Sequence, residues 1–234
     1  VKVENVVALL KQYGLETKPP EKIDGCRVLG LRVAEERGWL AWSRDNNIEE
    51  LSKLRTKRQI FSWCGQVVGH YPVADWLRPA CSYLKRLAST GTWDDEVSEH
   101  ALWVARNISV MVRQNDPVRG VWNVGETKDA TVWCDASSLA VGAALEIEGK
   151  RVEDGCWLRK AEDTSHINLA ELDSVIRGVN MAVVWNIKKL VICTDSATVA
   201  GWLKSMVTGE RRVRTSGLGA MLARRRLSLI DDTA

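Results

Sequence analysis

The fold is decided by the stretch TVWCDASS at residues 131–138, in which an apolar run leads into a carboxylate. Thr131 to Cys134 has the β-branched and aromatic content of a strand, and Leu139 to Ile147 predicts a second strand of the same hairpin. Asp135 would then lie at the end of the first strand. An alternative role for Asp135 is structural, because aspartate often favours a turn by bonding its own backbone.

Two more carboxylates lie at the edges of apolar segments further along the chain. Glu171 falls in the first turn of an amphipathic helix, which is predicted by apolar residues at helical spacing from Leu169 to Val183. Asp195 follows the buried-strand pattern of Leu190 to Cys193 and precedes a helical pattern from Ala197 to Val207. The sequence therefore predicts the order hairpin, further strand, helix, strand, helix, with one acid at the first strand, the first helix and the fourth strand.

Each of the later acids also has an ordinary structural alternative. Asn168 and Glu171 could be the N-cap and N3 residues of a capping-box-like pair. Asp195 could serve in N-capping of the helix that follows it, where Thr194, Asp195 and Ser196 are all good caps. Three independent structural roles would not often produce carboxylates in this order. We therefore expect the three acids to converge on a divalent metal site in an α/β fold.

Three short motifs carry a likeness to a known family: Asp135-Ala136-Ser137, Asn168-Leu169-Ala170-Glu171-Leu172 and Thr194-Asp195-Ser196. Their carboxylates are separated by 36 and 24 residues. This ordered set resembles the ribonuclease H domain of long-terminal-repeat retroelement polymerases, and the resemblance covers roughly residues 130 to 230. It implies a ribonuclease H-like mixed sheet with flanking helices.

The same resemblance implies hydrolysis of the RNA strand of RNA·DNA hybrids by two-metal catalysis, with Mg²⁺ or alternatively Mn²⁺ as the cofactor. Two such ions about 4 Å apart clamp the attacking water and the leaving oxygen, and hard cations prefer carboxylate oxygens. By resemblance, Asp135 would bridge both metals, Glu171 would help to hold the metal on the leaving-group side, and Asp195 would coordinate from the end of the fourth strand.

One part of the family pattern is missing from the sequence. Members of the family carry a fourth acidic ligand after a fifth strand and a late helix, whereas this sequence stops shortly after an arginine-rich segment. Asp231 or Asp232 could substitute for it, but acids at a chain end are usually just solvated. With Val1 in place of methionine, we expect a piece of a longer polyprotein or of a damaged genomic copy. The alternative function is a catalytically inactive nucleic-acid-binding or assembly fragment.

The first half of the chain has a different pattern. A helix is predicted over residues 1–13, a hairpin over Arg27 to Trp42, and a basic helical stretch over residues 53–70. The hairpin, the basic stretch and Gly69-His70-Tyr71-Pro72 together resemble the primer-grip, thumb and connection region of retroelement reverse transcriptases, nearest to the Bel/Pao-like group. The predicted organisation is thus a smaller α+β thumb and connection-like region at 1–129, followed by a C-terminally truncated ribonuclease H-like domain at 130–234.

Basic side chains in both parts are candidates for binding nucleic acid, because each phosphate neutralised by lysine or arginine releases a counterion. Solvated helix surface is the alternative for the same residues. The expected partners are an RNA·DNA hybrid or template-primer duplex and the remainder of the polyprotein. The candidate contacts are Lys53, Arg55, Lys57, Arg58, Arg211 and Arg212. We expect most of the tryptophans to pack in the core, and Trp63 and Trp76, near the basic stretch, are candidates for stacking on a base or sugar. No catalytic role is assigned to His166.

Composition sets the remaining limits. The chain has 234 residues and 45% hydrophobic content, which is enough to bury one or two cores. Its net charge is +3. Its six cysteines form no Cys-x-x-Cys pair, so we do not expect a zinc site. We expect a reducing, intracellular location in the cytoplasm or nucleus. The sequence has no signal peptide and no apolar run of about 18 residues, so no membrane association is expected.

Overall fold

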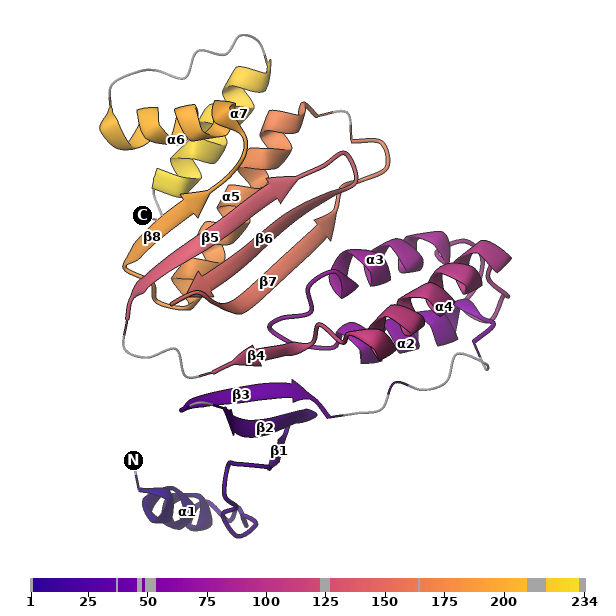
Figure 1. The fold of residues 1–234 in the computed structure, drawn as a ribbon, viewed down its shortest axis with the longest axis vertical. Helices are drawn as coiled ribbons and strands as arrows, with labels where there is room; N and C mark the ends of the chain where they lie inside the picture. The colour runs from indigo at the N-terminus through magenta and orange to yellow at the C-terminus, as the bar shows by residue number, and fades with distance from the viewer. Residues whose placement is uncertain are drawn as a thin grey trace.

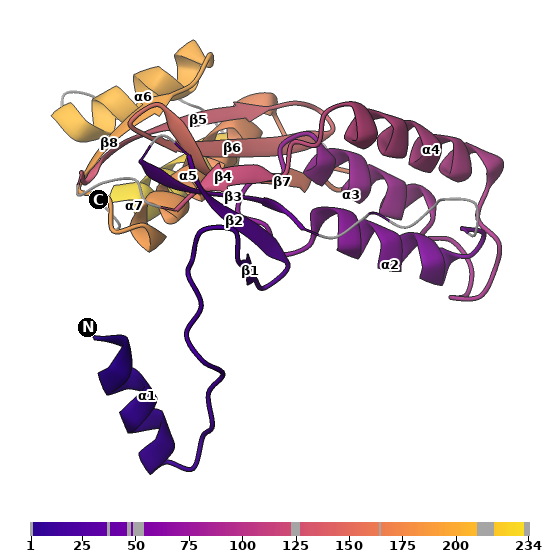
Figure 2. The same ribbon diagram turned by 60° about the horizontal axis from the view of Figure 1, so that its bottom comes forward.

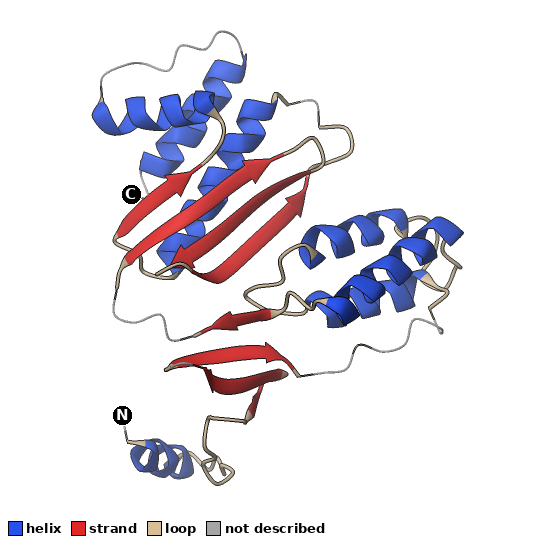
Figure 3. Ribbon diagram, in the orientation of Figure 1, coloured by secondary structure: helices blue, strands red, loops and turns tan. Residues whose placement is uncertain are grey.

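The computed structural model describes residues 2–36, 38–45, 48, 54–122, 127–163, 165–209 and 218–231. Within these ranges the chain is mixed α/β, with two four-stranded sheets and seven helices (Figure 1, Figure 3). Lys53, Arg211, Arg212 and Asp232 lie outside the described residues, as does the side chain of Asp231. The predicted α/β class is confirmed.

The larger sheet contains the strands predicted around the three acids. Its members are β5 (Asp129–Ala136), β6 (Ala140–Ile147), β7 (Lys150–Leu158) and β8 (Lys189–Cys193), in the order β7-β6-β5-β8. β5, β6 and β7 are antiparallel neighbours, whereas β8 runs parallel to β5. Side chains alternate between faces: Val132 and Cys134 of β5 are buried, while Trp133 and Asp135 are exposed on the other face.

Helix α5 (Ile167–Val184) packs against β5 and β6 and lies behind the sheet in Figure 1. The approach is close, because a Cβ on Gly178 would lie 2.6 Å from a methyl group of Val132. α6 (Ala197–Thr208) and α7 (Leu218–Asp231) complete this part of the molecule. Ala223, Leu227 and Ile230 of α7 join the core beneath the sheet.

The N-terminal half contains the smaller sheet and a helical bundle. The sheet consists of β1 (Arg27–Val28), β2 (Leu31–Glu36), β3 (Trp39–Arg44) and β4 (Arg119–Val121), all antiparallel, so the predicted hairpin is confirmed. The bundle consists of α2 (Lys57–Val68), α3 (Leu77–Leu87) and α4 (Glu99–Gln114). α1 (Val3–Gln12) buries none of its residues and stands apart from the rest of the chain in Figure 2.

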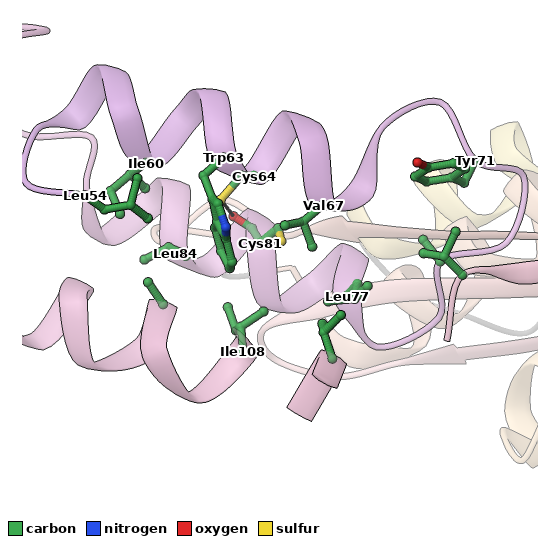
Figure 4. Close-up of a cluster of buried hydrophobic side chains, with 14 of the residues drawn as sticks. Leu54, Ile60, Trp63, Cys64, Val67, Tyr71, Leu77, Cys81, Leu84 and Ile108 are labelled. Carbon is green, nitrogen blue, oxygen red and sulfur yellow. Dashed lines mark hydrogen bonds between the residues drawn. The ribbon is translucent and has the colours of Figure 1, made fainter. Parts of the chain in front are cut away.

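Two separate hydrophobic clusters underlie this organisation. One comprises buried residues between Leu31 and Val118, and the other comprises buried residues between Ala130 and Ile230. Trp63 lies in the first cluster among Ile60, Leu84 and Ile108, as Figure 4 shows, and is only 2% exposed. The core packing expected of most tryptophans is therefore confirmed for Trp63, and the alternative, stacking on a base or sugar, is wrong for this residue, since the packing of α2 on its neighbours turns the side chain inward.

A buried carboxylate, that of Asp154, is one of the links between the bundle and the larger sheet. Asp154 of β7 is 8% exposed, and its side chain accepts hydrogen bonds from the backbone N–H groups of Ala74 (3.0 Å) and Asp75 (2.7 Å). Arg78 of α3 donates to the same carboxylate at 2.5 Å. Because α3 has no side-chain N-cap of its own, this acid from another element compensates the start of the helix.

Within the described residues, no helix is both long enough and apolar enough to cross a lipid bilayer.

Candidate metal centre

The three carboxylates predicted from the sequence come together at one end of the larger sheet. One oxygen of each of Asp135, Glu171 and Asp195 lies within 4.8 Å of the others. Strand pairing explains the position of two of them: Trp133 is in register with Cys193, and each acid follows its paired residue by two positions. Since β5 and β8 are parallel, both acids fall at the same edge, and α5 brings Glu171 to the same point. The predicted first-turn position of Glu171 is wrong, because α5 already begins at Ile167 and has no acidic residue in its first turn.

The turn alternative for Asp135 is wrong. Asp135 lies inside β5, where it pairs with Gly142 of β6. The turn that follows is held by Ser137, whose Oγ accepts from the N–H groups of Leu139 (3.2 Å) and Ala140 (3.1 Å). The exposed carboxylate of Asp135 is therefore available for another role.

The capping alternatives for the other two acids are also wrong. The N-cap of α5 is His166, whose Nδ1 accepts from the N–H of Asn168, so Asn168 is already within the helix. The N-cap of α6 is Ser196, whose Oγ accepts from the N–H of Val199, and Asp195 precedes it.

Glu171 is the buried member of the group. Its side chain is 7% exposed, and its Oε2 has no hydrogen-bond partner. Burial raises the pKa of Glu171, and the nearby charges of Asp135 and Asp195 raise the pKa further, against a smaller opposing effect of a backbone hydrogen bond from Ala136. A buried, unpartnered carboxylate oxygen is costly, and a cation bound among the three acids would satisfy it.

The donor set fits a hard divalent cation. All three donors are carboxylate oxygens, as Mg²⁺ and Mn²⁺ prefer. Cys134 lies close by, but burial raises the pKa of its thiol to about 12, so it remains protonated at neutral pH. All six cysteines are free. The three carboxylates are therefore a candidate site for a hard divalent cation.

We expect Glu171→Gln to stabilise the metal-free protein at neutral pH. An acid whose pKa is raised on folding contributes stability below its unfolded pKa of about 4.3, and that contribution is lost as the pH rises through the folded pKa. At pH 7 the charged carboxylate therefore opposes folding, and its removal should recover about 1–3 kcal/mol. Thermal denaturation in EDTA from pH 3 to 8 measures this, and the gain should shrink as the pH falls through the raised folded pKa and be absent below about pH 4.

The same variant has a second expected property. Mg²⁺ or Mn²⁺ should raise the melting temperature of the parent chain but not that of Glu171→Gln, because the variant lacks one of the three ligand charges. A variant that is less stable than the parent at every pH, with or without metal, would show instead that this carboxylate has a structural role.

Of the predicted nucleic-acid contacts, the structure describes Arg55, Lys57 and Arg58, and it does not bring these three to the metal centre. Lys57 donates to the backbone carbonyls of Ser89 (2.8 Å) and Gly91 (3.1 Å), and Arg58 forms an exposed ion pair with Asp94. Arg55 donates to the carbonyl of Leu54. These residues lie at the start of α2, which is roughly 16 Å along the helix axis from its other end. The chain meets β7 beyond that other end, at Pro72. Their binding of nucleic acid stays a prediction.

One residue near the acids was missed in the sequence. Trp133 is 52% exposed on the same face of β5 as Asp135. The signal that could have found it is the two-residue alternation of a strand, which places positions i and i−2 on one face. Trp76, which was predicted as a stacking residue, is half-buried and lines the same cavity as Trp133, Asp135 and Asp195.

Comparison with known proteins bears on the helical bundle alone. The family model described as "Domain of unknown function (DUF7047)" matches residues 56–114, which is 59 of the 234 residues. The match runs from the N-cap of α2 to the end of α4 and includes none of the three carboxylates. A search of curated proteins finds no match to the chain.

Proposed function

We propose that this chain carries a divalent-metal-dependent nuclease of the ribonuclease H type, which hydrolyses the RNA strand of RNA·DNA hybrids, and that it is the C-terminal part of a retroelement polymerase. The observation that carries the proposal is the convergence of Asp135, Glu171 and Asp195, with a buried oxygen of Glu171 that lacks a partner. The strand order β7-β6-β5-β8, with three antiparallel strands and a parallel fourth, supports a ribonuclease H-like fold.

The residues of the chain would have distinct tasks at this site. Asp135 and Asp195, both exposed, would hold cations at the edge of the sheet, while the buried Glu171 supplies a ligand from beneath. Bound Mg²⁺ would supply Lewis-acid stabilisation of the negative charge that develops at the phosphodiester and would lower the pKa of water. His166 and Ser196 would fix the starts of the two helices that border the ligands.

Hybrid specificity is proposed to come from shape. An RNA·DNA hybrid differs from B-DNA in its A-like geometry and in the 2′-hydroxyls of its minor groove. The thumb and connection-like region at 1–129 is proposed to hold the duplex beside the metal centre, where the basic residues Lys53, Arg55, Lys57 and Arg58 would contribute sequence-independent contacts.

The test is cleavage of an end-labelled RNA strand in an RNA·DNA hybrid, with double-stranded DNA and double-stranded RNA as comparison substrates. We expect RNA cleavage in the hybrid that requires Mg²⁺ or Mn²⁺ and stops in EDTA. Hybrid binding without cleavage in any metal would instead support the alternative, a catalytically inactive nucleic-acid-binding or assembly fragment.

A further inference from the structure

A cavity of about 780 Å³ adjoins the three carboxylates on the face of the sheet opposite α5. Asp135 and Asp195 lie in its lining, so the cavity is continuous with the candidate metal centre. Its lining on β6 includes Gly142 and Ala144, which pair with Asp135 and Trp133 respectively. Because these residues are small, the surface of the sheet is recessed beside two large aromatic side chains, Trp133 and Trp76.

The two tryptophans come from different parts of the chain. Trp133 belongs to β5, and its indole N–H donates to the carboxylate of Glu146 at 2.9 Å, which fixes the orientation of the ring. Trp76 is the residue before α3, and the bonds from Ala74 and Asp75 to Asp154 hold its segment against β7. The helical bundle therefore contributes an aromatic residue to the surroundings of the metal centre.

Charged groups at the bundle end of the cavity are already paired. Asp75 forms an ion pair with Arg151 at 2.7 Å, and Asp154 is bonded to Arg78. Among the described lining residues, this end of the cavity therefore has one cation, Arg151, which is paired with Asp75 and whose buried Nε has no hydrogen-bond partner. The aromatic and small side chains of this end suit an uncharged, flat group, since bases and sugars stack on aromatic rings regardless of sequence.

We propose that this cavity is a nucleoside subsite, in which the base or sugar next to the scissile phosphate of the bound strand stacks on Trp133, with Trp76 closing the subsite from the bundle side. The inference rests on the proposed function, because it takes the strand to be held by the carboxylates. Trp133 lies about 7 Å along the strand from Asp135, so one bound nucleotide can contact both.

Two opposite changes test the subsite. Trp133→Ala removes the stacking surface from an exposed position, and Ala144→Leu fills the cavity at its pairing partner. Trp103→Ala is the matched control, since Trp103 of α4 is 57% exposed and does not line the cavity. We expect the first two variants to raise the KM for hybrid cleavage about tenfold and the control to leave it unchanged.

Binding and cross-linking provide a readout that is independent of cleavage. Fluorescence anisotropy with a labelled hybrid, in an Asp135→Asn background, should show the same loss of affinity for Trp133→Ala and Ala144→Leu. A hybrid carrying 5-bromouridine in the RNA strand should cross-link to Trp133 or Trp76 under ultraviolet light, as mapped by mass spectrometry.

The outcomes separate the two proposals. Cleavage by the parent with unchanged KM and affinity in both variants would overturn the subsite and leave the nuclease standing. Binding that depends on both positions and cross-links to either tryptophan, in a parent that does not cleave, would support the subsite and overturn the nuclease. Binding that ignores both changes in a parent that does not cleave would overturn both proposals.

Discussion

Asp135→Asn is expected to abolish hybrid cleavage, with a fall in kcat of roughly a thousandfold or more. The substitution keeps the shape of the side chain and removes the charge that a metal would need. Because Asp135 is exposed and the adjoining turn is held by Ser137, the fold should be retained. The measurements are cleavage rates at saturating Mg²⁺ and Mn²⁺, with circular dichroism and a melting curve on the same protein.

Asp129→Asn provides the matched control for this experiment. Asp129 lies on the same strand and the same face, six residues before Asp135, and its exposed carboxylate is 3.7 Å from the amine of Lys189. Its loss should leave cleavage within a factor of two of the parent. Full cleavage by Asp135→Asn would remove this acid from the proposed chemistry, while loss of folding would return it to a structural role.

The sequence predicted which acids converge but not what holds the neighbouring helix starts. The order of apolar segments was sufficient for the first result, because parallel β5 and β8 bring their carboxyl ends to the same edge. The capping predictions failed because several good caps lie within a few residues of each helix start. To decide between His166 and Asn168, or between Ser196 and Asp195, one must know the helix boundary to within one residue. Hydrophobic periodicity does not locate a boundary that closely.

Contacts between distant segments were the other part that the sequence could not provide. Trp63 has basic neighbours in the sequence, but the packing of α2, α3 and α4 decided that it is core. Trp76 and Trp133 are 57 residues apart and line one cavity because Asp154 attaches the start of α3 to β7. No local pattern around Asp154 indicates that it bonds residues about 80 positions away.

This attachment gives the largest expected effect on stability. Asp154→Ala would leave Arg78, whose side chain is 19% exposed, without its carboxylate partner, and would remove the acceptor for two backbone N–H groups. Breaking a buried pair by removing one partner costs about 3–5 kcal/mol. We expect a loss near 3 kcal/mol, because Arg78 keeps its bonds to the carbonyls of Tyr71 and Pro72. Urea denaturation followed by circular dichroism measures it.

Asp75→Asn distinguishes burial from proximity, because Asp75 also links the bundle to β7, through Arg151, and asparagine tolerates the positive φ of 49° at this position. Both members of that pair are more exposed, at 50% and 39%, so its loss should cost less than about 1 kcal/mol. Equal effects of the two variants would mean that the buried carboxylate has no special role in joining the bundle to the sheet. If Asp154→Ala costs much more stability, the same variant should also raise the KM for the hybrid when it is assayed under conditions in which it is still folded. The reason is that the segment carrying Trp76 loses its bonds to the Asp154 carboxylate beside the metal centre.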